Sequence, residues 1–212
     1  MSDTSFGPGA ALIVIDMQND FCSGGSLAVP GGDSVLPAVN RLIGLAGLVV
    51  LTQDWHPRRH GSFASSHRGR QPLETIEVAY GSQTLWPDHC VQGTYGAALH
   101  GDLRADRAAL IVRKGMRPDV DSYSAFFEND RVSTTGLDGW LRARGAERVV
   151  LCGLAYDFCV AYSALDAARL GFATTVVEDA CATIDLDGSR AAQTAAMRAA
   201  GVSLLSMAAI GA

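Results

Sequence analysis

The stretch RVVLCGLAYDFCVAYSALDAARL, residues 148–170, predicts a buried strand, a tight turn and a helix. Its first apolar run, VVL at 149–151, is typical of a strand covered on both faces. After Gly153, apolar residues recur at helical spacing up to Gly171, where we expect the helix to end. We expect Asp157 to cap the N-terminus of this helix, because a carboxylate there can accept backbone N–H bonds.

Cys159 lies in the first turn of this predicted helix. The partial positive charge at a helix N-terminus favours a thiolate over a thiol, so Cys159 could be a nucleophile. The alternative is a small buried core residue, which is the commoner fate of a cysteine. Taken alone, the segment leaves both interpretations open.

Size and composition favour an enzyme-like globular protein over a nucleic-acid or membrane-surface binder. With 212 residues, 48% of them hydrophobic and 18% charged, the chain is expected to form one domain over residues 1–212. The formal charge is −5 and there is no basic block, so we expect neither nucleic acid nor a membrane as partner. The longest apolar runs are too short to span a bilayer.

Two further features indicate a cytoplasmic protein. We expect no secretory signal, because the first ten residues lack a charged segment followed by an apolar one. The five cysteines are odd in number and show no CxxC spacing, which favours free thiols in a reducing compartment over a disulfide framework.

Strand and helix patterns alternate along the rest of the chain. We expect further strands at 10–15, 48–52, 108–112, 173–177 and 202–205, helices at 34–46, 137–144 and 189–200, and irregular loops at 17–32, 53–92 and 115–129. This order predicts an α/β fold, a doubly wound, mostly parallel sheet of about six strands with helices on both faces.

Reactive side chains follow four of these strands. In such folds, ligands bind beyond the carboxyl ends of the strands. Asp16 ends the first strand, Asp54 follows the second, Lys114 follows the third, and the turn to Cys159 follows the fourth. We therefore expect these four side chains to meet at one edge of the sheet.

Asp16, Lys114 and Cys159 form a candidate set for cysteine-dependent hydrolysis. Asp16 could take the thiol proton and pass it to a leaving amine, and Lys114 could keep Asp16 ionised and lower the thiol pKa. Backbone N–H groups around Ala155 and Cys159 could stabilise an oxyanion. The alternative is an ordinary ion pair at a sheet edge beside a core cysteine.

A second set of residues has the composition of a metal site. The segment DWHPRRHGSF supplies Asp54, His56 and His60, and WPDHC supplies Asp88 and His89. Imidazoles with a carboxylate suit one divalent ion, Zn²⁺, Fe²⁺ or Mn²⁺. The alternative is that these are solvent-exposed loop histidines, as we expect His67 and His100 to be.

Aromatic residues accompany both sets and could form the walls of a pocket for a flat ring, or belong to the core. They are Phe21, Trp55, Phe63, Trp86, Tyr123 and Tyr156.

Five motifs together resemble the bacterial nicotinamidases, or pyrazinamidases, of the isochorismatase-like cysteine hydrolases. They are DMQNDFC, QDWHPRRHGSFASSH, LWPDHCVQGTYGAALH, the Lys114–Gly115 pair followed by DSYSAFF, and GLAYDFCV. The resemblance covers nearly the whole chain in the same order, and it implies the three-layer sandwich of that family.

The resemblance also implies a role for each site residue. Cys159 would be the nucleophile, Asp16 the proton carrier and Lys114 the supporting cation. Asp54, His56 and His89 would bind the metal, with His60 or Ser62 as a possible further ligand. Phe21 and Trp86 would enclose a pyridine ring, with Tyr123, Leu154 and Tyr156 also in the substrate site, and a cis Leu154–Ala155 peptide would shape the oxyanion hole. Many members have Thr in place of Tyr156.

The implied activity is hydrolysis of nicotinamide, and of pyrazinamide, to the acid and ammonia, in NAD salvage. Two rivals are a related amidase for a ureido or carbamoyl compound, and a non-enzymatic module that senses metals or thiols. A homo-oligomer is also considered, since the apolar segment SMAAIGA at 206–212 could pack on its own domain or on a partner.

Overall fold

The computed structural model describes residues 6–210, and its centre is a parallel sheet of six strands in the order β5-β2-β1-β6-β7-β8. Their bounds are β1 (Ala10–Ile15), β2 (Val49–Asp54), β5 (Leu110–Lys114), β6 (Arg148–Gly153), β7 (Ala173–Cys181) and β8 (Ser203–Leu205). Every pair of neighbours is parallel. The predicted fold class is confirmed.

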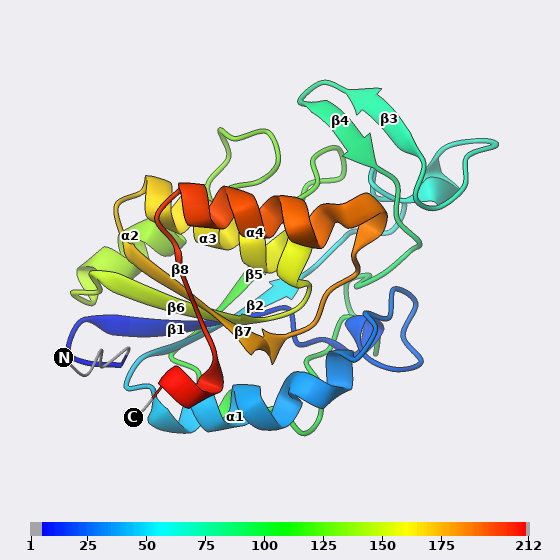
Figure 1. Cartoon of the computed structure of the whole chain (residues 1–212). Helices are drawn as coiled ribbons and strands as arrows, with labels where there is room; N and C mark the ends of the chain where they lie inside the picture. The colour runs from blue at the N-terminus through cyan, green and yellow to red at the C-terminus, as the bar shows by residue number, and fades with distance from the viewer. Residues whose placement is uncertain (1–5, 211–212) are drawn as a thin grey trace.

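Helices cover both faces of this sheet, as Figure 1 shows. One face carries α1 (Leu36–Leu45), and the other carries α2 (Leu137–Ala143), α3 (Ala161–Arg169) and α4 (Ser189–Ala199). Side chains of β1 alternate between the two layers: Leu12 and Val14 join the core beside α1, whereas Ile13 joins the core beside the other helices. Because β1 is buried on both faces, its sequence is a continuous apolar run rather than an alternating one.

The structure moves several predicted boundaries. Strand β5 runs to Lys114, two residues beyond the prediction, because it pairs with β2 until Lys114 lies opposite Asp54. The predicted helix at 34–46 begins with a 3₁₀ turn, Gly32–Val35, before α1. The loop expected at 53–92 contains a hairpin, β3 (Thr75–Val78) and β4 (Gly81–Thr84), which stands beyond the carboxyl end of the sheet (Figure 1). Its half-exposed, polar strands lack the apolar pattern that marks the others.

The prediction that Asp157 caps a helix is wrong. A π-helical turn, Tyr156–Val160, leads directly into α3 without a side-chain cap. The Asp157 carboxylate instead accepts hydrogen bonds from the backbone N–H groups of Ile184 and Asp185, at 3.0 and 2.7 Å, and from the Ser189 hydroxyl. It thereby fastens the π-helical turn to the loop that follows β7.

The apolar C-terminal segment packs on its own chain. Ile210 is only 2% exposed and belongs to the core beside α1, and the Met207 N–H donates to the Asp179 carboxylate at 2.7 Å. Residues 211–212 of the predicted segment lie outside the described residues. Among residues 6–210, no helix is long and apolar enough to cross a membrane.

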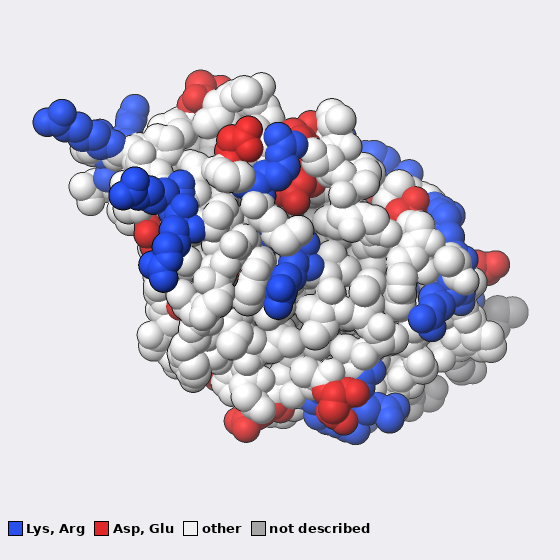
Figure 2. Space-filling view, turned by 180° about the vertical axis from the view of Figure 1, so that it is seen from behind, with Lys and Arg blue, Asp and Glu red and all other residues white. Residues whose placement is uncertain are grey.

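Charges are mixed over the surface shown in Figure 2. Lys and Arg side chains are scattered over that face and several stand beside Asp or Glu. That face therefore offers no broad basic surface of the kind that binds a phosphate backbone.

Candidate active site

Lys114 lies at the centre of the site, fully buried at the end of β5. Its Nζ lies 2.9 Å from Asp16 Oδ2 and is also paired with Asp54 Oδ1. The same ammonium donates to the Ser122 carbonyl at 3.0 Å and lies 3.5 Å from Cys159 Sγ. The structure therefore brings the four side chains expected at the sheet edge into one contact cluster.

The position of Asp16 is set by its own backbone and by Thr52. Asp16 follows β1 with φ of 47°, a left-handed conformation that is uncommon outside glycine. The Thr52 hydroxyl donates to Asp16 Oδ1 at 2.6 Å and accepts from the Asp16 N–H at 3.0 Å. Since Oδ1 is engaged by Thr52, Oδ2 is the oxygen that faces Lys114.

The pKa values of the two carboxyl groups beside Lys114 are shifted in opposite directions. Burial raises the pKa of Asp16, and the pull of Lys114 does not cancel that effect. Burial also acts on Asp54, but Lys114 and His56 hold its pKa well below the ordinary value. Burial opposes the charge on Lys114 as well, yet both carboxylates keep its pKa well above normal. Asp16 is therefore the group suited to hold and release a proton, while Asp54 stays ionised.

The surroundings of Cys159 favour the thiol over the thiolate. Burial raises its pKa well above the usual range, and Lys114 only partly offsets this. The effect expected from the helix end is thus outweighed by burial. A buried thiol would need a base in contact with it to act as a nucleophile, and Asp16, Asp54 and Cys159 offer polar atoms that all lie within 4.8 Å of one another.

The backbone before Cys159 packs closely against the end of β1. The Leu154–Ala155 peptide is cis, as the family resemblance implies. Gly153 has φ of 114°, and a Cβ there would lie 2.2 Å from the Ile15 carbonyl oxygen, so only glycine fits against β1. Ala155 and Cys159 both line the same pocket.

Asp54, His56 and His89 form a set that fits a divalent cation. The Nε2 atoms of His56 and His89 lie 3.6 and 3.7 Å from Asp54 Oδ2. Each Nδ1 donates to a backbone carbonyl, that of Gly115 at 2.9 Å for His56 and that of Pro87 at 2.8 Å for His89. Both Nε2 atoms therefore present a lone pair, and His56 Nε2 is buried without a hydrogen-bond partner.

His60, Ser62 and Asp121 lie next to this set and differ in whether they could act as a further metal ligand. The His60 ring stacks on His56 at 4.3 Å, but its Nε2 donates to the Val120 carbonyl at 3.2 Å and its Nδ1 is engaged by the Ser62 hydroxyl at 2.7 Å. Both ring nitrogens of His60 therefore already have partners, although His56, His60 and Asp121 also form a group that could hold a metal ion. Asp121 Oδ1, in contrast, lies 4.0 Å from His56 Nε2.

Asp121 is a pocket residue that our sequence reasoning missed, although it lies two residues before Tyr123. Gln83 of β4 donates to its Oδ2 at 2.7 Å, which gives the unpredicted hairpin a part in shaping the site. Its neighbour Tyr123 accepts a hydrogen bond from Trp86 Nε1 at 3.1 Å. The pocket lining combines predicted and unpredicted residues: Phe21, Leu27, Asp54, Trp86, His89, Asp121, Tyr123, Ala155, Phe158, Cys159 and Ile184.

Leu154 and Tyr156, predicted for the substrate site, are absent from that lining. Leu154 is fully buried in the core beside α1. The Tyr156 hydroxyl lies 3.2 Å from Glu178 and 2.9 Å from Thr194, and its residue borders a different hollow. The reason is the direction of the π-turn, which presents Ala155, Phe158 and Cys159 to the pocket and turns Tyr156 away.

Two other aromatic residues also lie outside the pocket lining. Phe63 is fully buried beneath the rings of His56 and His60, and Trp55 stacks under the guanidinium of Arg113 at 3.8 Å. Of the remaining histidines, neither is fully exposed: His67 donates to the Gly61 carbonyl at 2.8 Å, and His100 faces Asp33 at 3.7 Å.

The fold and this arrangement define a cysteine hydrolase of the isochorismatase type, and the chain belongs to that family: the Isochorismatase domain matches residues 10–209. Over 196 residues, 92% of each chain, it is 50% identical to the nicotinamidase of Acinetobacter baylyi. It also superposes on a nicotinamidase and pyrazinamidase of Acinetobacter baumanii with a TM-score of 0.94 and 51% identity, covering 95% of this chain and 98% of the other.

Two further solved structures carry ligands. The yeast nicotinamidase Pnc1p bound to the inhibitor nicotinaldehyde superposes with a TM-score of 0.87 and 31% identity, covering 93% of this chain and 99% of that one. The pyrazinamidase of Pyrococcus horikoshii in complex with zinc superposes with a TM-score of 0.75 and 37% identity, covering 94% and 99%. Groups that could hold a metal ion are present in this chain as well.

Proposed function

We propose that this protein is an amidohydrolase that converts nicotinamide to nicotinic acid and ammonia, and that it also hydrolyses pyrazinamide. The observation that carries the proposal is the contact cluster of Asp16, Lys114 and Cys159, of which Cys159 lines an aromatic pocket. The identity of half the residues with a nicotinamidase over nearly the whole chain supports the same substrate.

The pocket suits a flat heteroaromatic amide. Phe21, Trp86 and Tyr123 border it, and Trp86 packs edge-on against Phe158 with ring centroids 5.0 Å apart. These rings would bind the faces and edge of the pyridine, and Cys159 would lie against the carboxamide.

Amide cleavage would then proceed through a thioester. The Cys159 thiol gives its proton to Asp16 as sulfur attacks the carbonyl carbon, and the N–H groups of Ala155 and Cys159 bind the oxyanion. When the C–N bond breaks, Asp16 returns the proton to the leaving nitrogen, which departs as ammonia. Lys114 stabilises the carboxylate form of Asp16 before the first transfer and after the second.

Hydrolysis of the thioester restores the enzyme. A water molecule gives a proton to Asp16 as the water oxygen attacks the thioester carbonyl. Asp16 then passes this proton to the departing sulfur. The products are nicotinic acid and the Cys159 thiol, so one water is consumed for each ammonia released.

We further propose that Asp54, His56 and His89 hold one divalent cation, of which zinc is a candidate. Such an ion supplies a Lewis acid that can bind the ring nitrogen of the substrate. Asp54 would then serve Lys114 through Oδ1 and the ion through Oδ2, which links the two sets of residues. His60 and Ser62 would support His56 rather than bind the ion.

The two rival functions are not favoured. A ureido or carbamoyl substrate has no flat ring to fill a pocket bordered by Phe21, Trp86 and Tyr123. A non-enzymatic sensor would not need a buried thiol in contact with a proton carrier.

Two broader expectations belong to the same proposal. We infer that residues 1–212 form one domain and that the protein works in the cytoplasm, where its five free cysteines would stay reduced. A homo-oligomer stays a prediction.

The test is ammonia release from nicotinamide and pyrazinamide by purified protein, before and after chelation and after resupply of Zn²⁺, Mn²⁺ or Fe²⁺. We expect release to be lost on chelation, restored by metal and absent in Cys159→Ala. Release that survives thorough chelation would remove the metal from the mechanism but keep the cysteine. No release with any metal would contradict the proposed function.

A further inference from the structure

A second group of metal-ligating side chains lies outside the substrate pocket. Cys22 follows the 3₁₀ turn Asn19–Phe21, Asp33 lies in the turn Gly32–Val35, and His100 lies in the loop that leads toward β5. One ligand atom from each residue lies within 4.8 Å of the other two. Asp33 Oδ1 and His100 Nε2 are 3.7 Å apart, a separation that ligands of one tetrahedral ion can share.

The donor types are those of a zinc site rather than a calcium or magnesium site. A thiol, an imidazole and a carboxylate are the side chains that bind Zn²⁺, whereas the hard cations take oxygen alone. With three protein ligands, the fourth position would go to water. Thiolate ligation also favours zinc over Mn²⁺ or Mg²⁺.

The site combines a buried ligand with an open approach. Cys22 is 3% exposed, whereas the side chains of Asp33 and His100 are 39% and 22% exposed. A hollow of about 150 Å³ opens over the group and is lined by polar residues that include Asn19 and Ser23. An ion with its waters can therefore reach the sulfur from solvent.

Neighbouring groups already orient the ligands. The N–H of Ser23 donates to Asp33 Oδ2 at 2.9 Å and its hydroxyl binds the same oxygen, so Oδ1 is left to face His100. A carboxylate fixed through one oxygen and presenting the other is the usual support around a metal ligand. The backbone N–H of His100 donates to the Met17 carbonyl at 2.8 Å, which fixes this segment next to the end of β1.

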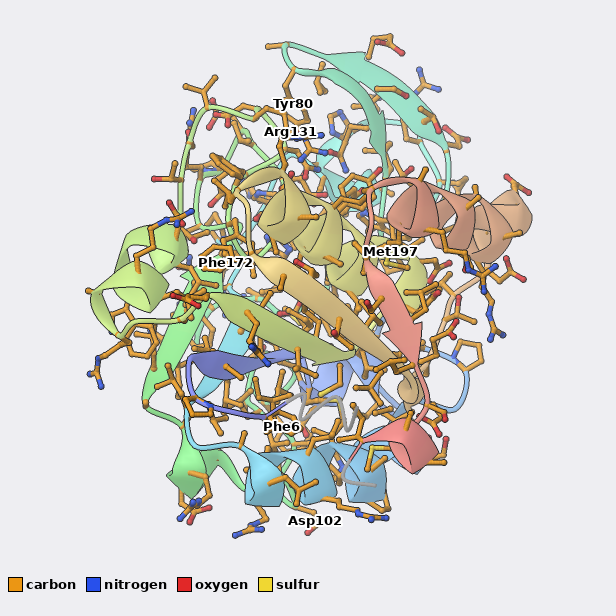
Figure 3. All side chains as sticks on the ribbon, turned by 60° about the vertical axis from the view of Figure 1, so that its left-hand side comes forward. Phe6, Tyr80, Asp102, Arg131, Phe172 and Met197 are labelled. Atoms are coloured by element: carbon orange, nitrogen blue, oxygen red, sulfur yellow. The ribbon has the colours of Figure 1, made fainter. Side chains whose placement is uncertain are left out.

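Two features limit the affinity of the site. Burial and the neighbouring Asp33 raise the pKa of the Cys22 thiol to about 12, so zinc would have to displace its proton. The Asp102 N–H donates to His100 Nδ1 at 3.2 Å, so an ion on Nε2 would require a proton on Nδ1 and the loss of this long hydrogen bond. Asp102 is exposed, and Figure 3 places it on the outer side of α1. The bond can therefore be given up, and the ion would exchange rather than be held permanently.

We propose that Cys22, Asp33 and His100 form a second, exchangeable site for Zn²⁺ that closes the loop containing Phe21 and Leu27. Cys22 and Asp33 lie near the two ends of that loop, and both Phe21 and Leu27 line the substrate pocket. An ion held by Cys22, Asp33 and His100 would thus restrict one wall of the pocket without touching the substrate.

The first experiment is equilibrium dialysis of chelator-treated full-length protein against free Zn²⁺, with metal counted per chain. We expect about two ions in the wild type and about one in Cys22→Ser, in His100→Gln and in His89→Gln. His67→Gln is the matched control, because His67 is also a partly buried loop histidine but lies in no ligand group, and it should still bind about two.

A second measurement identifies the ligand sulfur. With Co²⁺ in place of zinc, the wild type should show a sulfur-to-metal charge-transfer band that is lost in Cys22→Ser and kept in Cys159→Ser. Hydrogen exchange of residues 19–33 should slow when the second zinc ion binds, and this effect should be absent in His100→Gln, which also serves if Cys22→Ser folds poorly.

Two results would overturn the second site. One is a wild type that binds a single zinc ion, which is lost in His89→Gln alone. The other is an unchanged zinc count in both His100→Gln and Cys22→Ser. Nicotinamide turnover by Cys22→Ser and His100→Gln separates this failure from a failure of the proposed activity, because Cys22, Asp33 and His100 lie outside the lining of the substrate pocket.

Discussion

Asp16 and Asp54 flank the same ammonium, that of Lys114, but their surroundings separate their chemistry. Asp54 has His56 beside it as well as Lys114, whereas Asp16 has a hydroxyl and burial. When the surroundings shift the pKa values of two carboxyl groups apart, one group commonly transfers protons while the other stays ionised and stabilises charge. At the scale of single residues, the site therefore assigns the proton to Asp16.

Exchanging each carboxylate for its amide should separate the two functions. We expect Asp16→Asn to lower kcat for nicotinamide by about 10²–10⁴-fold while Zn²⁺ affinity in the Asp54 site changes little. Asp54→Asn should weaken that affinity by about a hundredfold or more, because it alters a ligand itself. Steady-state kinetics and zinc competition with a chromophoric chelator measure both. A mild loss of kcat in Asp16→Asn would show that another group moves the proton.

The raised pKa of Asp16 should appear in the pH profile. Asp16 must be ionised to accept the thiol proton, so kcat/KM should fall as the pH is lowered through its pKa, on a limb that lies above pH 3.8. Because the Thr52 hydroxyl bond favours the ionised form, Thr52→Val should move this limb to higher pH, and Thr52→Ser should not. An unmoved limb in Thr52→Val would assign it to a different group.

The orientation of Tyr156 predicts that it does not select substrates. In Tyr156→Phe the ratio of pyrazinamide to nicotinamide turnover should stay within about twofold of the wild type, while the lost contacts to Glu178 and Thr194 cost about 1 kcal/mol of unfolding free energy. Parallel kinetics and urea unfolding test this. A changed ratio of pyrazinamide to nicotinamide turnover with an unchanged unfolding free energy would show that Tyr156 contacts the substrate.

At the scale of elements, each strand end places one reactive group, and glycines allow neighbouring elements to come close. Gly115 follows β5 with φ of 64°, and a Cβ there would lie 2.4 Å from His56 Cε1. Its carbonyl also accepts the Nδ1–H of His56. The residue after Lys114 therefore orients the His56 ring, which lies just beyond the neighbouring strand β2.

Gly115→Ala should accordingly weaken zinc binding by displacing His56, by about 10–100-fold. Gly69→Ala is the matched control, since Gly69 also has a positive φ, 77°, but no atom within 4 Å of a Cβ. Both changes incur the cost of a left-handed alanine, about 1–2 kcal/mol, so only the difference in zinc affinity reports on His56. Equal affinities in the two variants would show that His56 tolerates the displacement.

At the scale of the whole molecule, the proposed ion joins segments that are far apart in the chain. Asp54 ends β2 and His56 follows it, and His89 follows the β3–β4 hairpin. His56 and the segment after His89 are already paired, since the His56 N–H donates to the Cys90 carbonyl at 3.0 Å. An ion bound here adds to contacts that the folded chain makes by itself, so its binding should stabilise the native state without being needed to form it.

Metal removal should therefore lower the unfolding temperature without unfolding the protein. In His100→Gln, which isolates the Asp54 site, zinc at about a hundredfold above Kd should add about 2.7 kcal/mol, or about 5–10 °C. Differential scanning calorimetry with and without chelator measures this. Adding His89→Gln should abolish the shift, and a shift that persisted would place the ion elsewhere.

The sequence by itself determined the layers of the fold and the members of the catalytic set. Buried parallel strands are continuous apolar runs, so β1 and β6 can be predicted from residue types alone. The residue after each strand must then lie at the edge of the sheet where ligands bind. Asp16, Asp54 and Lys114 were found in that way. Their identity as candidates depended only on local order along the chain.

Tertiary structure decided everything that depends on which way a side chain points. The pKa difference between Asp16 and Asp54 arises from burial and from His56, which lies on a different segment. The inward turn of Phe158, the outward turn of Tyr156 and the group formed by Cys22, Asp33 and His100 likewise result from the packing of distant segments. A sequence pattern records periodicity within an element, whereas these contacts are set between elements.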